Sequence, residues 1–133
     1  MRPDSSDASA PSKWMDNART DLALASIPLP KGVKYELLCF HAQQAAEKSM
    51  KAVLLKCEVE FPFTHNLSAL LDLLQGCMPI PIELRDVVDL NPYAVVTRYP
   101  GEIEPVKKDD YLDAIRLATM TVRWAESIID TPE

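Results

Sequence analysis

The stretch CFHAQQAAEKSMKAVLLK, residues 39–56, decides the fold of this chain. Its apolar residues recur at intervals of three and four, the spacing of one buried face of an α-helix: Cys39, Ala42, Ala46, Met50 and Val53. The alanines on that face allow a neighbouring helix to approach closely. We therefore predict a long central helix over about residues 33–56, with its small side chains in a core or a dimer interface.

The same stretch carries polar residues whose role the spacing leaves open. They form one narrow stripe nearly opposite the apolar face, with two more on its flank: His41, Gln44, Lys48 and Lys51, then Gln43 and Glu47. Charged side chains on a helix usually face water, which favours a solvated face. A histidine beside two glutamines is a group of hydrogen-bond donors and acceptors, which favours the floor of a binding site.

Helix-type spacing continues through the rest of the chain, and strand-type alternation is nearly absent. Ser12 is expected to cap a first helix that runs to about Ser26, and further elements follow: helices over 66–75, 81–90 and 108–129, and an irregular segment over 91–107. The pattern predicts an all-α protein, an antiparallel up-and-down helical bundle that resembles a four-helix bundle but has five helices, two of them short. Residues 1–11 are expected to form a disordered tail and residues 12–130 a single domain.

Composition and charge narrow the class of protein. The chain has 133 residues and a formal net charge of −6, which opposes binding to nucleic acid through bulk positive charge. Residues 1–11 are polar, which is not typical of a signal peptide, and no apolar run approaches the ~20 residues that span a bilayer. We therefore expect a cytoplasmic protein without membrane contact. Cys39, Cys57 and Cys77 form no CxxC pair and are expected to be buried free thiols. With two histidines in the chain, His41 and His65, a multi-histidine metal centre is not expected. No cofactor is expected either.

A second candidate site lies in the stretch TRYPGE, residues 97–102. Its proline and glycine occupy the central positions of a type II turn, which would hold Arg98 and Tyr99 in a defined orientation. An arginine offers a planar fork for phosphate, and a tyrosine offers a stacking face for a base. The alternative is an ordinary turn with a packed tyrosine and a solvated arginine. In the third candidate, Thr64-His65-Asn66, the simplest role of Thr64 or Asn66 is to cap the following helix.

Together these residues resemble the HEPN domain, named for higher eukaryotes and prokaryotes nucleotide-binding. The resemblance spans about residues 14–129 and rests on four stretches: Trp14, Ala18 and Asp21-Leu22; CFHAQQAAEK at 39–48 with Lys51-Ala52; THNL at 64–67 with Leu70-Leu71; and RYP at 98–100. It implies an antiparallel helical bundle that forms a homodimer and binds a nucleotide. It also implies a partner, a minimal nucleotidyltransferase, in a toxin–antitoxin-like pair.

Other branches of that family are metal-independent ribonucleases, which use an arginine followed four to six residues later by a histidine. No arginine of this chain has a histidine at that distance. A nuclease of that branch needs the histidine as general acid or base beside the arginine that stabilises phosphate charge. Catalysis of that kind is therefore not expected here.

The leading hypothesis is a binding module for a nucleotide or for the nucleotidyltransferase, without chemistry of its own. Its expected ligand-binding residues come from two stretches: Arg98 and Tyr99 from the loop, and His41, Gln44, Lys48 and Glu47 from the central helix. Glu47 has an alternative structural role, tethering Arg98. Two further hypotheses are an RNA-cleaving toxin in which His41 or His65 meets Arg98, and a structural dimer whose polar stripe contacts its partner.

Overall fold

The computed structural model describes residues 10–95 and 104–130 of the chain. Five helical elements span them: α1 (Pro11–Ala25), α2 (Tyr35–Lys56), α3 (Leu67–Gln75), the 3₁₀ helix η1 (Ile82–Ala94) and α4 (Lys108–Ile129). No strand occurs within these residues. The predicted all-α class and the helical bundle are confirmed.

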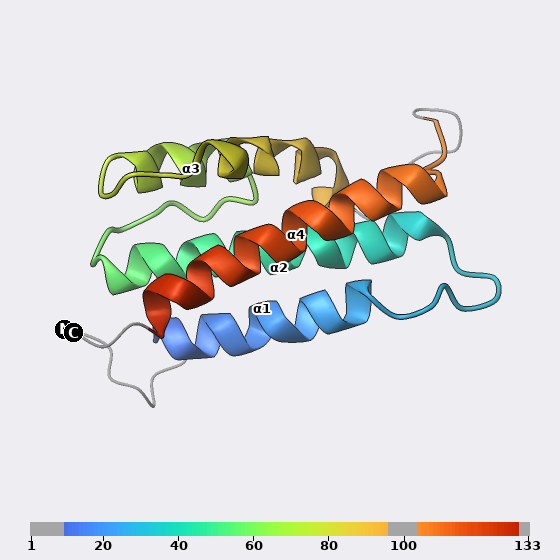
Figure 1. Ribbon diagram of the computed structural model, residues 1–133, viewed down its shortest axis with the longest axis horizontal. Helices are drawn as coiled ribbons and strands as arrows, with labels where there is room; N and C mark the ends of the chain where they lie inside the picture. The colour runs from blue at the N-terminus through green and yellow to red at the C-terminus, as the bar shows by residue number, and fades with distance from the viewer. Residues whose placement is uncertain (1–9, 96–103, 131–133) are drawn as a thin grey trace.

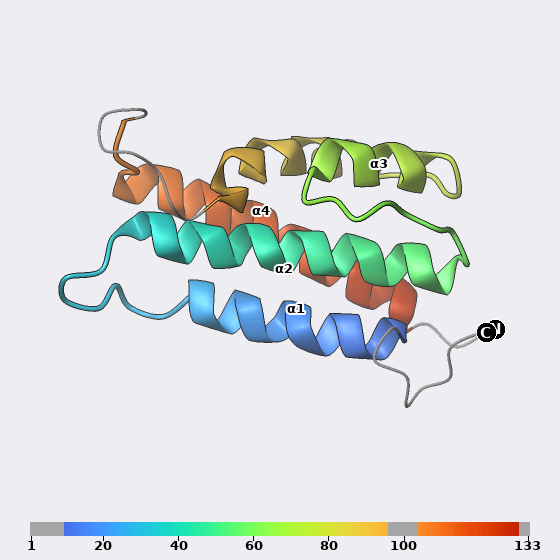
Figure 2. The same cartoon turned by 180° about the vertical axis from the view of Figure 1, so that it is seen from behind.

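The chain direction alternates along the bundle, as Figures 1 and 2 show. In the view of Figure 1, α1 and η1 run from left to right, whereas α2, the short α3 and α4 run from right to left. α2 lies at the centre because it contacts each of the other four elements. Thirteen of its 22 residues are buried, so α2 has no fully solvated face.

The core forms where the small side chains of α2 meet larger ones from its neighbours. Ala42, Ala45 and Ala46 are fully buried, as predicted for the apolar face of the central helix. Larger buried side chains from every other element complete the same cluster: Met15, Leu67, Leu70, Leu74, Leu84, Val87, Leu90 and Val122. Burial of such side chains contributes about 1.5–3 kcal/mol each, which makes this cluster the main source of stability.

Two predicted helix starts differ from the structure. α1 begins at Pro11 with Ala10 as N-cap, so the prediction that Ser12 caps it is wrong. Proline suits the first helical position because its missing N–H would have had no partner there. α1 thus takes in the last residue of the predicted tail, and residues 1–9 lie outside the described part. α2 begins at Tyr35, after Gly32 turns the chain with a φ of 79°.

η1 is longer and tighter than the predicted short helix. It is a 3₁₀ helix that continues past Leu90 to Ala94, so the prediction of irregular chain from Asn91 onward is wrong for these residues. The Asn91 side chain joins this extension to α3, because its Oδ1 accepts a hydrogen bond of 2.8 Å from the backbone N–H of Leu67. Asn66 caps α3 as predicted, with its Oδ1 accepting from the backbone N–H of Ser68 at 2.9 Å.

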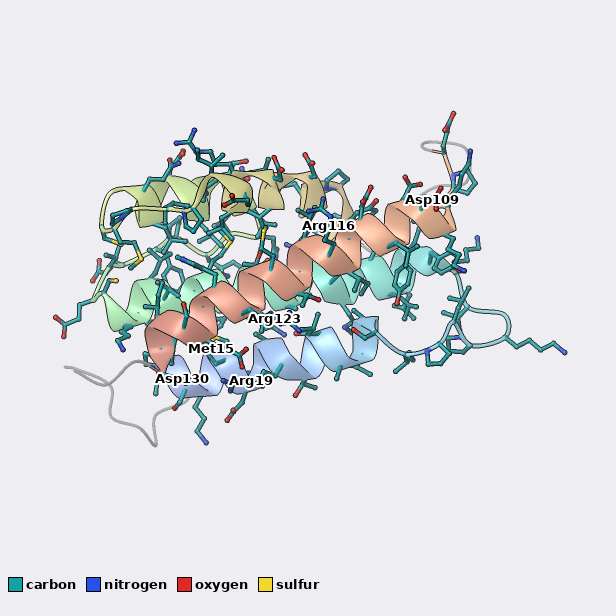
Figure 3. All side chains as sticks on the ribbon, viewed as in Figure 1. Met15, Arg19, Asp109, Arg116, Arg123 and Asp130 are labelled. Atoms are coloured by element: carbon teal, nitrogen blue, oxygen red, sulfur yellow. The ribbon has the colours of Figure 1, made fainter. Side chains whose placement is uncertain are left out.

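Polar contacts join α1 to α4 at two places, one at the middle of α1 and one at its C-terminal end. Arg19 Nε donates to Glu126 at 2.6 Å, and its guanidinium lies 3.6 Å from Asp130, at the end of the bundle seen in Figure 3. The hydrogen bond with Glu126 raises the pKa of Arg19 above its ordinary value. At the C-terminal end of α1, the Tyr111 hydroxyl donates to the carbonyl of Ala25 at 2.6 Å.

The three thiols differ in exposure. Cys39 is buried as predicted, and burial raises its pKa to about 12. Cys57 is half-buried, and Cys77 is exposed, so the prediction of buried thiols is wrong for Cys77. The reason is its place in the turn that follows α3, beyond the apolar face of that helix.

Among the described residues, no helix has the length and apolarity to cross a membrane.

Candidate functional site

A buried carboxylate of α1 binds two of the predicted site residues. Asp21 lies on the face of α1 that packs against α2, and its side chain is 10% exposed. His41 Nδ1 lies 3.0 Å from Asp21 Oδ1, and Lys48 Nζ lies 2.6 Å from Asp21 Oδ2. An ionised carboxylate only accepts hydrogen bonds, so both nitrogens donate to it. The polar stripe therefore connects α2 to α1 at this point.

A second polar network surrounds Glu47 on the neighbouring face of α2. Glu47 Oε2 accepts from Lys51 Nζ at 3.1 Å, and its Oε1 lies 2.9 Å from His65 Nδ1. Gln43, fully buried, donates from Nε2 to Glu47 Oε1 at 3.1 Å and to the His65 carbonyl at 3.2 Å. The network fixes the segment before α3 against the central helix, and it holds His65 by both its ring and its backbone.

The Lys51 ammonium is enclosed by aromatic rings as well as by its carboxylate. Its side chain is 5% exposed, and its Nζ lies over three rings with centroids at 5.6, 5.6 and 6.0 Å: Trp14, Phe61 and Phe63. Such cation–π contacts are worth about 2 kcal/mol or more when the cation is desolvated. The charge of Lys51 is therefore satisfied inside the protein.

The structure divides the predicted α2 site residues into these two networks. His41 and Lys48 belong to the Asp21 network, whereas Glu47 belongs to the second, and Gln44 joins the second by donating to Gln43 Oε1 at 2.7 Å. The interpretation of these residues as an incidental solvated face is wrong for His41, Lys48 and Glu47. Their side chains are 25%, 26% and 4% exposed, respectively. The predicted loop residues, Arg98 and Tyr99, lie outside the described residues.

A hollow of about 330 Å³ opens beside His65, between the segment that precedes α3 and the end of η1. Its described lining comprises His65, Asn66, Asn91 and Ala94. The hollow is shallow and largely open to solvent, so a ligand there would be only partly enclosed. His65 is the half-exposed member, since its side chain is 54% exposed while its Nδ1 contacts the buried Glu47. Phe63 lies with its ring centroid 5.8 Å from the His65 ring and is 95% exposed.

A second hollow, of about 160 Å³, lies between η1 and α4. Its charged lining residues are three carboxylates and one guanidinium: Asp89, Asp110, Asp113 and Arg116. This excess of negative charge would repel a phosphate group.

Within residues 10–95 and 104–130, no group of three or more histidine, cysteine or acidic side chains is placed to hold a metal ion.

Sequence reasoning missed the roles of Asp21, Asn91 and Phe63. A signal for Asp21 exists, because the acid lies three residues after Ala18 and four before Ala25, at a core-facing position of α1. An acid at such a position requires a cationic partner on the facing helix. Asn91 and Phe63 carry no such signal, because their neighbours come from segments far away in the sequence or from loop geometry.

The comparison with protein families agrees with the resemblance. A family model described as the HEPN domain matches residues 11–128, which covers both polar networks and the hollow beside His65. No curated protein and no solved structure shows a significant match to the chain.

Proposed function

This chain belongs to the HEPN domain family, and on that premise we propose that it is a nucleotide-binding module without bond-breaking chemistry of its own. Membership of the family supports a nucleotide-binding or ribonuclease-type module. The observation that favours binding is the hollow beside His65, which the Glu47 network positions at the bundle surface.

The groups that line the hollow are suited to a nucleotide. His65 donates from Nδ1 to Glu47, so its Nε2 is the ring nitrogen left to contact a ligand. Asn66 uses its Oδ1 as the α3 cap, which leaves its amide nitrogen as a donor for a base edge or a ribose. Phe63, exposed beside His65, offers a face on which a base can stack, an interaction worth about 1–3 kcal/mol.

Phosphate recognition is proposed to depend on Arg98. The charge of Lys48 is neutralised by Asp21 and that of Lys51 by Glu47, so neither ammonium is free to bind an added anion. Arg98 follows Ala94, which lines the hollow, by four residues in the sequence. Together with Tyr99 it remains the proposed phosphate-binding residue, with the planar fork that suits this role.

The test is thermal unfolding with and without ATP, GTP, CTP and UTP at millimolar concentration. A nucleotide at a hundredfold excess over its Kd stabilises the fold by about 2.7 kcal/mol, a shift on the order of 10 °C for a domain of this size. Arg98→Ala and His65→Ala should remove most of the shift, each measured against its own ligand-free Tm. Arg123→Ala, the same change at an exposed position on α4, should keep it. Absence of any shift with all four nucleotides would contradict the proposal.

A ribonuclease is the second candidate, and one contact favours it. A carboxylate that accepts from the Nδ1 of an imidazole is an arrangement that orients histidine for acid–base chemistry, and Glu47 and His65 form it. The test is cleavage of single-stranded RNA in EDTA, which His65→Ala should abolish. An intact RNA substrate at stoichiometric protein would eliminate this candidate.

A homodimer and a minimal nucleotidyltransferase partner complete the proposal, as the family resemblance implies. The gene beside this one should encode the nucleotidyltransferase, and the two proteins should co-purify after co-expression. Light scattering on the isolated chain measures the dimer directly. A monomer that does not bind the neighbouring gene product would remove the toxin–antitoxin-like pairing and leave the nucleotide site to be judged on its own test.

A further inference from the structure

Exposed apolar side chains gather at one end of the bundle, where α1 ends and where α2 and α4 begin. This end lies at the right of Figure 1, and the stacked rings of Tyr35 and Tyr111, with centroids 5.0 Å apart, join the starts of α2 and α4 there. Among the described residues, five of the eight exposed large apolar side chains belong to this end: Leu24, Ile27, Leu29, Leu37 and Leu112. Exposed apolar side chains that gather in one place mark an interaction surface.

The connection between α1 and α2, residues 26–34, is the basic part of this surface. It contains Lys31 and Lys34 and no acid. Both lysines are exposed, and neither forms an ion pair with a residue in the described part of the chain. The backbone N–H of Val33 donates to the carbonyl of Pro30 at 3.0 Å, which gives the connection a defined shape. A connection of defined shape loses little conformational freedom when it binds.

The acidic hollow between η1 and α4 lies beside this surface, because its α4 residues come from the first half of that helix. Three carboxylates and one guanidinium give its lining a net charge of −2. The other lining side chains are uncharged: Leu90, Tyr93, Ala114 and Leu117. An apolar lining with negative charge suits a side chain that has an alkyl stem and an ammonium group, such as lysine.

We propose that this end of the bundle binds a second copy of the chain, with the α1–α2 connection of each copy seated on the acidic hollow of the other. The proposal rests on the homodimer of the proposed function and names its interface. Charge complementarity supports it, because Lys31 and Lys34 bring two positive charges to a lining with a net charge of −2. The exposed apolar side chains around the two lysines supply the apolar contact area of the interface.

The arrangement of the two parts suits two-fold symmetry. In a two-fold dimer a surface meets the same surface of its partner, so a positive part must lie beside a negative part. Successive residues of α4 provide this order: Tyr111 faces α1, Asp113 lines the hollow, and the exposed Leu112 lies on the outer face between them. Both contacts of the dimer can therefore form at once, and the assembly closes at two copies.

Charge reversal on the full chain tests this interface. Light scattering and sedimentation over a concentration series should give a wild-type dimer. Lys31→Glu with Lys34→Glu should raise the Kd of the dimer by roughly a hundredfold or more, because like charges then meet at both contacts. Asp89→Lys with Asp113→Lys should have the same effect, since it reverses the hollow instead of the connection.

A matched control and a mixture separate this interface from a general effect of charge. Lys13→Glu with Arg123→Glu makes the same change in net charge at exposed positions on other parts of α1 and α4, and it should leave the Kd unchanged. A mixture of the two reversed variants pairs opposite charges at both contacts again. The mixture should therefore dimerise with a Kd near that of wild type, which also shows that both variants are folded.

Each other outcome overturns the proposed interface in a distinguishable way. A wild-type dimer that both reversed variants retain would overturn the interface and leave the homodimer in place. Reversed variants that stay monomeric when mixed would also overturn it. A monomeric wild type would remove the homodimer as well, and the nucleotide site would still be judged by thermal unfolding. A monomeric wild type that loses the neighbouring gene product on Lys31→Glu with Lys34→Glu would assign the surface to that protein instead.

Discussion

Asp21→Asn should destabilise the protein strongly, although asparagine has nearly the same size and shape as aspartate. The substitution removes the charge that binds His41 Nδ1 at 3.0 Å and Lys48 Nζ at 2.6 Å, at a carboxylate 10% exposed. A hydrogen bond to a charged group contributes about 1.5–3 kcal/mol, and breaking a buried ion pair costs about 3–5 kcal/mol. Lys48 is 26% exposed and regains some water, so we expect a loss of about 2–3 kcal/mol. Urea unfolding followed by helical circular dichroism measures it, with the m-value unchanged.

The same helix supplies a matched control. Asp16→Asn makes the identical change at a side chain that is 70% exposed and lies 3.3 Å from Arg19, and we expect a loss within about 0.5 kcal/mol. A double-mutant cycle of Asp21→Asn with Lys48→Met should give a coupling energy of about 1–2 kcal/mol. Equal losses for Asp21→Asn and Asp16→Asn would show that burial of the Asp21 network adds no stability, and would refute the reasoning.

Three further outcomes are expected. Asn66→Ala should lower the stability by about 1 kcal/mol through loss of the α3 cap, measured by urea unfolding, while Asn66→Asp keeps most of it. Glu47→Gln should cost about 3 kcal/mol or more because the Lys51 ammonium stays buried, and adding Lys51→Met should restore part of that loss; a double variant less stable than Glu47→Gln would contradict this. The pKa of Cys39 is raised from 9.0 to about 12, so between these pH values the folded chain keeps a proton that the unfolded chain loses. The free energy of unfolding, measured by urea unfolding at several pH values, should therefore fall as the pH rises from 9 to about 12. The fall should be smaller in Cys39→Ser.

The fold could be predicted because its main determinant is periodic and local. The apolar spacing in residues 39–56 places a long helix correctly, and the helix over 108–129 matches α4 at both ends. Helix termini were harder, since Ser12 and Pro11 both suit a first turn and the sequence does not rank them. The extension of η1 is joined to α3 by a hydrogen bond between Asn91 and the backbone of Leu67, a contact that no local pattern records.

The site could be predicted only in part, because the sequence shows a helix face but not what covers it. His41 and Lys48 share one stripe in the sequence and one partner in the structure, but that partner, Asp21, comes from another helix. Lys51 was placed on the same stripe, yet the structure pairs it with Glu47 of the flank, because α2 is surrounded and its flanks are separate environments. Residues that are neighbours in a helical projection can therefore serve different networks when the helix is central.

The internal neutralisation of α2 constrains any nucleotide site on this protein. Lys48 and Lys51 each contact a carboxylate, so an added phosphate would have to displace a carboxylate already within hydrogen-bonding distance. That exchange gains little, because the ammonium loses one anion as it gains another. The hollow between η1 and α4 is acidic, and the hollow beside His65 offers an imidazole and amides. Nucleotide affinity beyond base and ribose contacts must therefore come from a cation outside these networks, which is why the proposal depends on Arg98.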